Sequence, residues 1–119
     1  MLQTEKQQLR RCYREARRTL SSEEKRFIDC KISDNLLKSD LYRDAACIFC
    51  YVSTSDEIGT AAILEQALTD GKTLCVPLCG KGGSMTARKI TALSELQTGH
   101  YGILEPSDTA PEIAPENID

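Results

Sequence analysis

The chain has 119 residues, of which 40% are hydrophobic and 28% charged, so it is long enough for one domain with a real core and too short for two comfortable ones. Six cations and two acids give residues 1–18 a charge of +4, whereas the remaining nine cations and sixteen acids give −7. This distribution excludes a general nucleic-acid-binding charge balance and indicates a local anion-binding feature on an acidic body.

The sequence also limits where the protein is expected to act. The N-terminal residues MLQTEKQQLRR lack the apolar run of a signal peptide, so the six cysteines do not indicate a secreted disulfide framework. No apolar stretch approaches the roughly 20 residues needed to cross a bilayer. We therefore expect a cytoplasmic, reduced protein without nucleic-acid or membrane partners, whose cysteines act as small core residues.

Residues 4–20 are predicted to form a helix with one apolar and one basic stripe. The apolar stripe recurs at three- and four-residue steps and consists of Leu9, Cys12, Tyr13, Ala16 and Leu20. The cations Lys6, Arg10, Arg14 and Arg17 recur at similar steps, and none has an acid four residues away. The basic stripe is either a solvated helix face or a phosphate-binding surface, because Arg and Lys donate charge-assisted hydrogen bonds to phosphate oxygens.

Ser21 followed by Glu24 predicts the start of a second helix, which should run to about Lys38. Its apolar residues predict a buried face made of Phe27, Ile28, Ile32, Leu36 and Leu37. A stripe of this kind is expected to pack against the core.

The next segment has the pattern of a strand, a helix and a second strand. AACIFCYV (residues 45–52) is a short apolar run typical of a strand covered on both sides, and TLCVPL (residues 73–78) is a second. Residues 60–69 between them are predicted to be a helix that Gly71 ends. This β–α–β pattern predicts a parallel pair of strands with a right-handed crossover.

The remainder of the chain carries weaker signals. A candidate strand, MTARKI, follows the loop CGKGGS and precedes a short helical piece around residues 92–96. Residues 99–119 hold three of the four prolines and neither Lys nor Arg. We expect a single domain over residues 1–119, with an α/β body over 1–98 and an irregular, proline-rich acidic connector over 99–119.

The cysteine spacing offers a possible metal site. Cys47 and Cys50 could form half of a zinc site, and Cys75 and Cys79 could supply the rest. Residues three apart on a strand point to opposite faces, however, so the two members of the first pair should not converge on one ion. A thioredoxin-type redox pair is disfavoured because its CxxC motif begins a helix.

The sequence presents no evident catalytic residue. The loop from Gly80 to Ser84 contains glycine and lysine after a strand, but it lacks the GxxxxGK[ST] spacing of a phosphate-binding loop and is read as a flexible connection. His100 is the only histidine, so no multi-histidine metal site can form. Carboxylates, or binding and electrostatics alone, would have to carry the chemistry.

Asp56 and Glu57 stand where the first predicted strand should end. Asp56 or the Thr60 hydroxyl could cap the following helix. The carboxyl ends of strands are also where open α/β sheets bind their ligands. Because one residue suffices for the cap, Glu57 is available to bind a ligand.

Six short motifs in this order resemble the 5-formyltetrahydrofolate cyclo-ligase (methenyltetrahydrofolate synthetase) family. They are Lys6-x-x-Leu9-Arg10, the SSEEK run at 21–25, DEIGT at 56–60, GK at 71–72 before a strand reaching Pro77, Met85 leading to Arg88 and Ile90, and YGILEP at 101–106. The resemblance implies a three-layer Rossmann-like α/β sandwich with a mainly parallel sheet. Family members continue beyond the equivalent of residue 119 into a glycine-rich segment that binds ATP phosphates and contributes to magnesium and folate binding. The chain is therefore expected to be the front part of such a domain, truncated and inactive or impaired by itself.

The implied reaction is an ATP-dependent ring closure that converts 5-formyltetrahydrofolate, possibly polyglutamylated, to 5,10-methenyltetrahydrofolate, with Mg²⁺ as the metal. By position in the family motifs, Lys6 and Arg10 would contact ATP phosphates. Glu57 would accept hydrogen bonds from the pterin, Val52 would line the pocket beside it, and Tyr101 would lie near the folate. No catalytic residue and no metal ligand is expected within this chain.

Two other functions stay open. The chain could be a non-catalytic remnant that binds nucleotide or folate, or an interaction protein that self-associates through an unpaired sheet edge.

Overall fold

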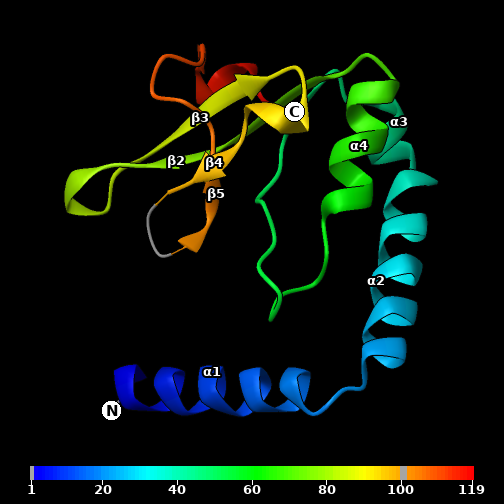
Figure 1. The fold of residues 1–119 in the computed structure, drawn as a ribbon, viewed down its shortest axis with the longest axis vertical. Coiled ribbons are helices and arrows are strands. Elements are labelled where there is room, and N and C mark those ends of the chain that lie inside the picture. The colour runs from blue at the N-terminus through cyan, green and yellow to red at the C-terminus, as the bar shows by residue number, and fades with distance from the viewer. Residues whose placement is uncertain (1, 100–101) are drawn as a thin grey trace.

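Three helices occupy the first third of the chain in the computed structural model, which describes residues 2–99 and 102–119 (Figure 1). They are α1 (Leu2–Arg18), α2 (Ser22–Leu37) and α3 (Asp40–Asp44). The Ser21 hydroxyl accepts from the Glu24 backbone N–H at 3.1 Å, and Glu24 Oε1 accepts from the Ser21 N–H at 3.2 Å. This reciprocal capping box explains why α2 starts where the sequence predicts.

The sheet has four strands in the order β1-β2-β3-β6. They are β1 (Cys47–Phe49), β2 (Thr73–Cys79), β3 (Met85–Ile90) and β6 (Glu112–Ile113). Helix α4 (Ala61–Thr69) connects β1 to β2, which are parallel, so the predicted β–α–β unit is confirmed. A separate pair, β4 (Gln97–Thr98) and β5 (Leu104–Glu105), is antiparallel, and short 3₁₀ turns occupy η1 (Lys81–Gly83), η2 (Leu93–Glu95) and η4 (Pro115–Asn117).

The α/β class is confirmed, but the sheet is mixed rather than mainly parallel. Strand β3 is antiparallel to both β2 and β6. The reason is the connection between β2 and β3, which spans only residues 80–84. A parallel crossover needs about a dozen residues or more, so this short loop can only form a hairpin.

The core lies on both faces of the sheet. Alternation along β2 places Leu74 and Val76 on the face covered by Leu64 and Ala67 of α4. Cys75 points to the other face, where it packs with Cys47 and Ala87, and Ile113 and Ile118 of the C-terminal segment cover this smaller cluster. Helices thus cover one face in the described part of the chain, and the C-terminal segment packs on the other.

The apolar stripe of α1 and much of that of α2 are exposed. On α1, Leu9 is 56% and Tyr13 63% exposed, and on α2, Phe27 is 67% exposed, whereas Leu37 packs against the core. The buried face predicted for α2 is therefore only partly present. Helical periodicity shows which face is able to pack, but it carries no information on whether another element covers that face.

Residues 102–119 contain regular structure, unlike the irregular connector that the sequence predicts. Strand β6 pairs with β3, with Ala87 opposite Ile113. The Arg88 guanidinium donates to the backbone carbonyls of Asp108 at 3.1 Å and Ala110 at 2.9 Å. The Asp119 carboxylate accepts from the N–H groups of Ala46 and Cys47. The predicted connector thus becomes part of the sheet and binds the start of β1.

Candidate functional site

The loop between β1 and α4 is cross-linked by side-chain hydrogen bonds. The buried Thr60 hydroxyl donates to the Tyr51 carbonyl at 2.9 Å and accepts from the Ser53 N–H at 3.1 Å. The Ser53 hydroxyl in turn accepts from the Thr60 N–H at 3.0 Å, and the Tyr51 hydroxyl donates to the Ile58 carbonyl at 3.0 Å. These bonds connect the two ends of the loop and so fix the positions from which residues 54–58 extend.

Glu57 lies at the tip of this loop. Its Oε1 accepts from the Thr54 N–H at 2.9 Å and from the Thr54 hydroxyl at 3.0 Å, and the Glu57 N–H donates to the Thr54 carbonyl. No described residue donates to its second carboxylate oxygen. The side chain is held by one oxygen and offers the other as an acceptor.

Helix α2 contacts the loop through Asp29, which lies against Gly59. A Cβ atom at Gly59 would lie 2.9 Å from Asp29 Oδ2, so a larger residue at this position requires the Asp29 carboxylate to shift. Lys25 fixes the same carboxylate oxygen through an ion pair of 2.6 Å. The glycine of the DEIGT motif therefore serves packing.

Asp56 is bonded to α1 and does not cap α4. The Asp56 carboxylate accepts from Arg18 at 2.9 and 3.2 Å, and its backbone carbonyl accepts from Arg17 Nε at 2.9 Å. Hydrogen bonds from Arg18, and then the charges of Arg18, Arg17 and Arg14, lower the pKa of Asp56. Thr60 occupies the cap position of α4, yet its hydroxyl makes no capping bond because it bonds to residues 51 and 53. The prediction that Asp56 or Thr60 caps this helix through its side chain is wrong.

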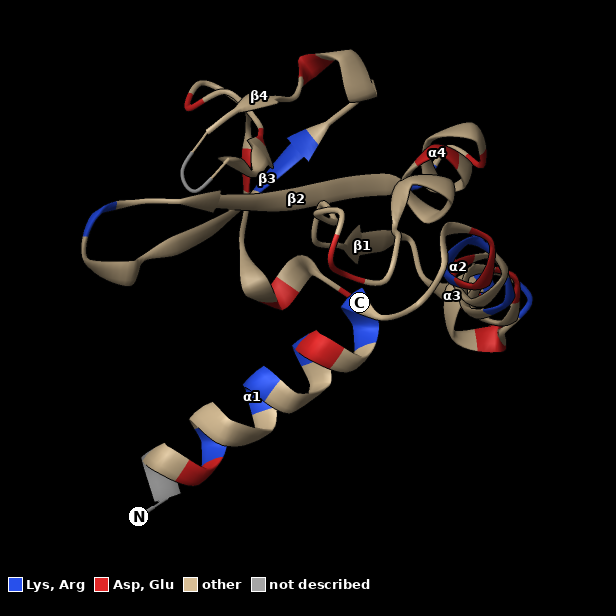
Figure 2. Ribbon diagram, turned by 60° about the horizontal axis from the view of Figure 1, so that its bottom comes forward, with Lys and Arg blue, Asp and Glu red and all other residues tan. Residues whose placement is uncertain are grey.

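These bonds also orient the basic stripe of α1. An α-helix turns about 100° per residue, so Lys6, Arg10 and Arg17 fall within about 40° of one another around the axis. Because Arg17 and Arg18 both reach Asp56, the side of α1 between their directions faces the loop; Arg10 lies about 30° and Lys6 about 70° from the middle of that side. Figure 2 shows the cations distributed along α1. Within the described residues, neither Lys6 nor Arg10 has an ion-pair partner.

The remaining predicted site residues differ in position. Val52 is 9% exposed and packs in the core with Leu64 and Val76, directly before the loop. Tyr101, like His100, lies outside the described residues. The structure thus joins the C-terminal end of α1 to the loop that carries Glu57, and it places Val52 in the core directly before that loop.

The cysteines do not converge as one set. Cys47 packs in the cluster with Cys75, whereas Cys50 packs against the cluster on the opposite face, as the strand geometry predicts. Cys47 and Cys75 place their Sγ atoms 3.9 Å apart in the core. In the described part of the chain, no three His, Cys, Asp or Glu side chains lie close enough together to hold a metal ion.

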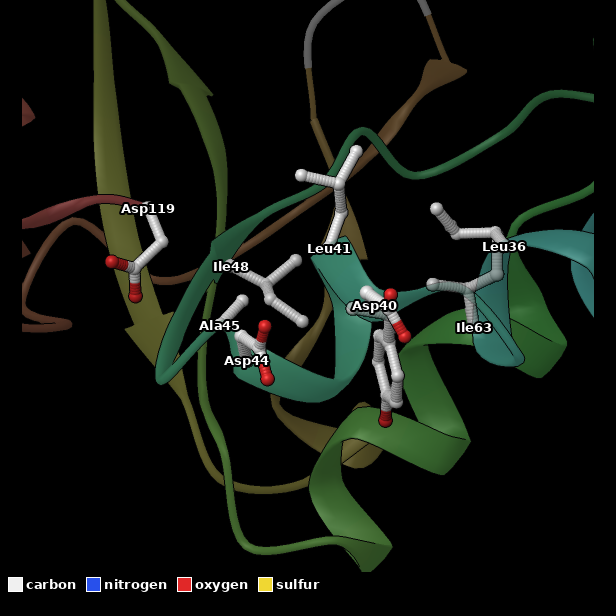
Figure 3. A pocket seen from close by; sticks show the side chains of 9 residues that line it. Leu36, Asp40, Leu41, Asp44, Ala45, Ile48, Ile63 and Asp119 are labelled. Carbon is white, nitrogen blue, oxygen red and sulfur yellow. The ribbon is translucent and has the colours of Figure 1, made fainter.

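A cleft of about 460 Å³ opens elsewhere, between α2, α3, β1 and α4 (Figure 3). Leu36, Leu41, Ile48 and Ile63 line it, and Asp40 and Asp44 lie at its rim. None of the predicted site residues contributes to it. Glu57 instead lines a small pocket of about 20 Å³ between the end of α1, the start of α2 and the loop of residues 51–60, where Arg17, Lys25 and Asp29 are among its neighbours.

Sequence reasoning missed the residues that hold α1 and this loop together. Arg17 and Arg18 looked like further members of a basic face, and Tyr51 and Ser53 carried no signal. Only the partners across the fold, 39 and 38 residues away for Arg17 and Arg18, give these side chains a role. In the sequence, the only indication of this contact was Asp56, an acid next to Glu57.

A β–α–β unit, an acidic loop after its first strand and a basic helix bonded to that loop define the class of the protein as α/β. The profile of the 5-formyltetrahydrofolate cyclo-ligase family matches residues 2–118, and the chain belongs to that family. The predicted family is confirmed.

A solved structure supports the same assignment. The NMR structure of 5,10-methenyltetrahydrofolate synthetase from Aquifex aeolicus superposes with a TM-score of 0.83 at 25% sequence identity. The match covers 100% of this chain and 58% of that one, so the chain spans less than two thirds of this relative. The curated proteins compared with the chain contain no match. No helix in residues 2–99 or 102–119 is long and apolar enough to span a membrane.

Proposed function

We propose that this chain provides the ATP- and folate-recognition surface of a 5-formyltetrahydrofolate cyclo-ligase. The observation that carries the proposal is the common orientation of the α1 basic stripe and the Glu57 loop, which Arg17 and Arg18 join through Asp56. A cationic and an acidic element on one surface suit a substrate pair that consists of a polyphosphate and a pterin. The family match and the Aquifex structure support the same activity.

The reaction transfers the γ-phosphoryl group of ATP to the formyl oxygen of 5-formyltetrahydrofolate. N10 then attacks the formyl carbon, the former formyl oxygen leaves as phosphate, and N10 loses its proton, which gives 5,10-methenyltetrahydrofolate and ADP. Such chemistry depends on positioning and charge stabilisation rather than on a protein nucleophile. It therefore fits a surface whose predicted contributors are cations and one carboxylate.

The residues have separate roles in this proposal. Lys6 and Arg10 bind phosphate oxygens, because both lack ion-pair partners within the described residues and both project from an exposed helix. Glu57 accepts hydrogen bonds from the pterin through the oxygen that Thr54 does not use. Val52 forms the wall beneath the loop, and Tyr101 is proposed to contact the folate. The protein is proposed to act in the cytoplasm.

Mg²⁺ accompanies ATP in phosphoryl transfer, where it neutralises charge on the phosphates. Among the described residues, no three potential ligands cluster, so they form no all-protein metal cage; Mg²⁺ that accompanies ATP needs only one or two carboxylates beside the phosphates. We assign no Mg²⁺ ligand to this chain and derive no step through the ion.

Two matched pairs of variants test the phosphate and pterin roles. Arg10 and Arg11 are adjacent and exposed but point about 100° apart on α1. In calorimetry, Arg10→Gln should weaken ATP binding by roughly tenfold or more, whereas Arg11→Gln should not. Glu57→Gln should weaken 5-formyltetrahydrofolate binding, whereas Glu65→Gln on α4 should not.

Catalysis is measured separately through the absorbance of the methenyl product with ATP and Mg²⁺. Binding of both ligands without product would identify a non-catalytic binding remnant. Equal effects of the Arg10 and Arg11 substitutions would contradict the phosphate role of α1.

Self-association is the second candidate function. Its support is Phe49 on the edge strand β1, which is 41% exposed. Sedimentation velocity tests it directly: a dimer that Phe49→Lys dissociates would favour edge pairing. A single monomeric species at all concentrations would rule it out.

A further inference from the structure

The contact between α1 and the loop of residues 51–60 concentrates on one residue, Asp56. Two consecutive arginines donate three hydrogen bonds to it, from Arg17 to the backbone carbonyl and from Arg18 to the carboxylate. Every residue from Thr4 to Arg18 is exposed, so burial of α1 side chains does little to fix the helix direction. We call this contact the Asp56 latch.

Because the latch lies at the C-terminal end of α1, a small change in its geometry displaces the other end of the helix. Arg17 and Arg18 end α1, and Lys6 lies about 17 Å from Arg17 along the helix axis. A tilt of about 10° at the latch would displace Lys6 by about 3 Å. Phosphoryl transfer loses rate when reacting groups are misplaced by about 1 Å, so the direction of α1 matters.

The same residue touches the proposed folate side of the surface. Asp56 is directly followed by Glu57, and both belong to the short turn that Thr54 closes through the Glu57 carboxylate and N–H. A ligand that orders this turn also fixes the Asp56 carboxylate, which accepts from Arg18. A ligand that orders α1 fixes Arg17 and Arg18, which donate to Asp56.

We propose that Asp56 is a positioning residue that couples the two ligand sites, so that ATP on α1 and folate at Glu57 each strengthen binding of the other. This inference rests on the proposed function, because it uses the same two sites. It adds a role for Asp56, Arg17 and Arg18 and the prediction of positive cooperativity between the ligands.

The exposure of the Arg18–Asp56 ion pair indicates that it positions α1 rather than stabilises the fold. The Arg18 and Asp56 side chains are 58% and 45% exposed, and exposed pairs contribute little to folding. Asp40, Asp44 and Arg43 form a more exposed group of ion pairs on α3, away from the contact between α1 and the loop. This group supplies the matched control, Asp44→Asn.

Calorimetry with β,γ-methylene-ATP, which cannot transfer its γ-phosphate, measures the coupling. The ratio of its Kd without and with saturating 5-formyltetrahydrofolate should exceed one in the wild type. Asp56→Asn should reduce the ratio by roughly two- to fivefold, Asp56→Glu should retain most of it, and Asp44→Asn should leave it unchanged.

The outcomes separate this inference from the proposed function. If the wild type binds both ligands with a ratio of one, or if Asp56→Asn and Asp44→Asn act alike, Asp56 does not couple the sites and the proposed function stands. If the wild type binds neither ligand, the proposed function fails and the inference fails with it.

Discussion

Thr60 shows how one buried hydroxyl organises the proposed folate loop. The side chain is 3% exposed and bonds to both Tyr51 and Ser53, the residues that open the loop. Without the hydroxyl, the Ser53 N–H loses its partner in a partly buried place, and the Tyr51 carbonyl keeps only the Cys50 thiol, at 3.4 Å. Unpaired groups of this kind each cost about 1–3 kcal/mol.

We therefore expect Thr60→Val to lower the free energy of unfolding by about 1–3 kcal/mol and to weaken folate binding. Thr69→Val is the control, since Thr69 is exposed and its hydroxyl bonds only within α4, to the Glu65 carbonyl. Urea denaturation of both variants provides the comparison. Equal losses would show that the loop does not depend on Thr60.

Tyr42 provides a pH-dependent test of the core. Its hydroxyl donates to Asp70 Oδ2 at 2.5 Å, and Lys72 Nζ lies 4.5 Å from its ring centroid. Burial, and then the hydrogen bond and charge of Asp70, raise the pKa of Tyr42 to about 12. An unfolded chain ionises tyrosine near pH 10, so this contribution to stability is complete below about pH 10 and is lost as pH rises to about 12.

The free energy of unfolding of the wild type should accordingly fall between about pH 10 and 12 more steeply than that of Tyr42→Phe. Tyr13→Phe, at a 63% exposed position on α1, should retain the wild-type slope. Denaturation at a series of alkaline pH values measures both. A slope in Tyr42→Phe as steep as in the wild type would assign the alkaline loss to other groups.

Among the elements, α2 is the best example of a local signal that decides the structure. Ser21 and Glu24 bond reciprocally, and these two residues alone specify the start of the helix. Ser21→Ala should cost about 1 kcal/mol of stability, whereas Ser22→Ala one residue later should cost little. Thermal denaturation of both variants tests this, and identical melting temperatures would contradict the role of the capping box.

The difference between local signals and long-range contacts explains how far the sequence could predict the fold. Residues 21 and 24, the apolar runs 45–52 and 73–78 and Gly71 act within a few positions, so helices α2 and α4 and the parallel pair were predictable. The pairing of β6 with β3 was not, because a two-residue strand has no periodicity to detect. The hairpin between β2 and β3 could have been predicted from its loop length, which the family resemblance overrode.

The residues of the candidate site differ in the same way: some are indicated by local sequence patterns, and others depend on tertiary contacts. Glu57 was predictable from its place after an apolar strand, and Lys6 and Arg10 from their unpaired spacing. The Asp56 latch depends on where α1 lies in space, and no spacing within α1 distinguishes Arg17 and Arg18 as its partners. Sequence patterns found the groups that would meet a ligand, while the groups that place them needed the tertiary structure.

At the scale of the whole molecule, Arg88 connects the sheet to the C-terminal segment. Its guanidinium donates to the carbonyls of Asp108 and Ala110, and Thr86 accepts from its Nε at 3.0 Å. The side chain is 21% exposed, so these bonds lie partly out of water. They hold residues 108–112 against β3, where the Pro111 carbonyl accepts from the Lys89 N–H at 2.8 Å.

Replacing Arg88 should therefore loosen β6 and the smaller core cluster beneath it. We expect Arg88→Met to lower the free energy of unfolding by about 1–3 kcal/mol and to speed amide exchange at Lys89, because the two carbonyls lose a charged donor. Lys89→Met is the matched control on the same strand, since the described residues show no hydrogen bond from the Lys89 side chain. If Arg88→Met left Lys89 exchange at the wild-type rate, the arginine would not be needed, and the β3–β6 pairing, the Asp119 hydrogen bonds and the packing of Ile113 and Ile118 would be sufficient to hold the C-terminal segment.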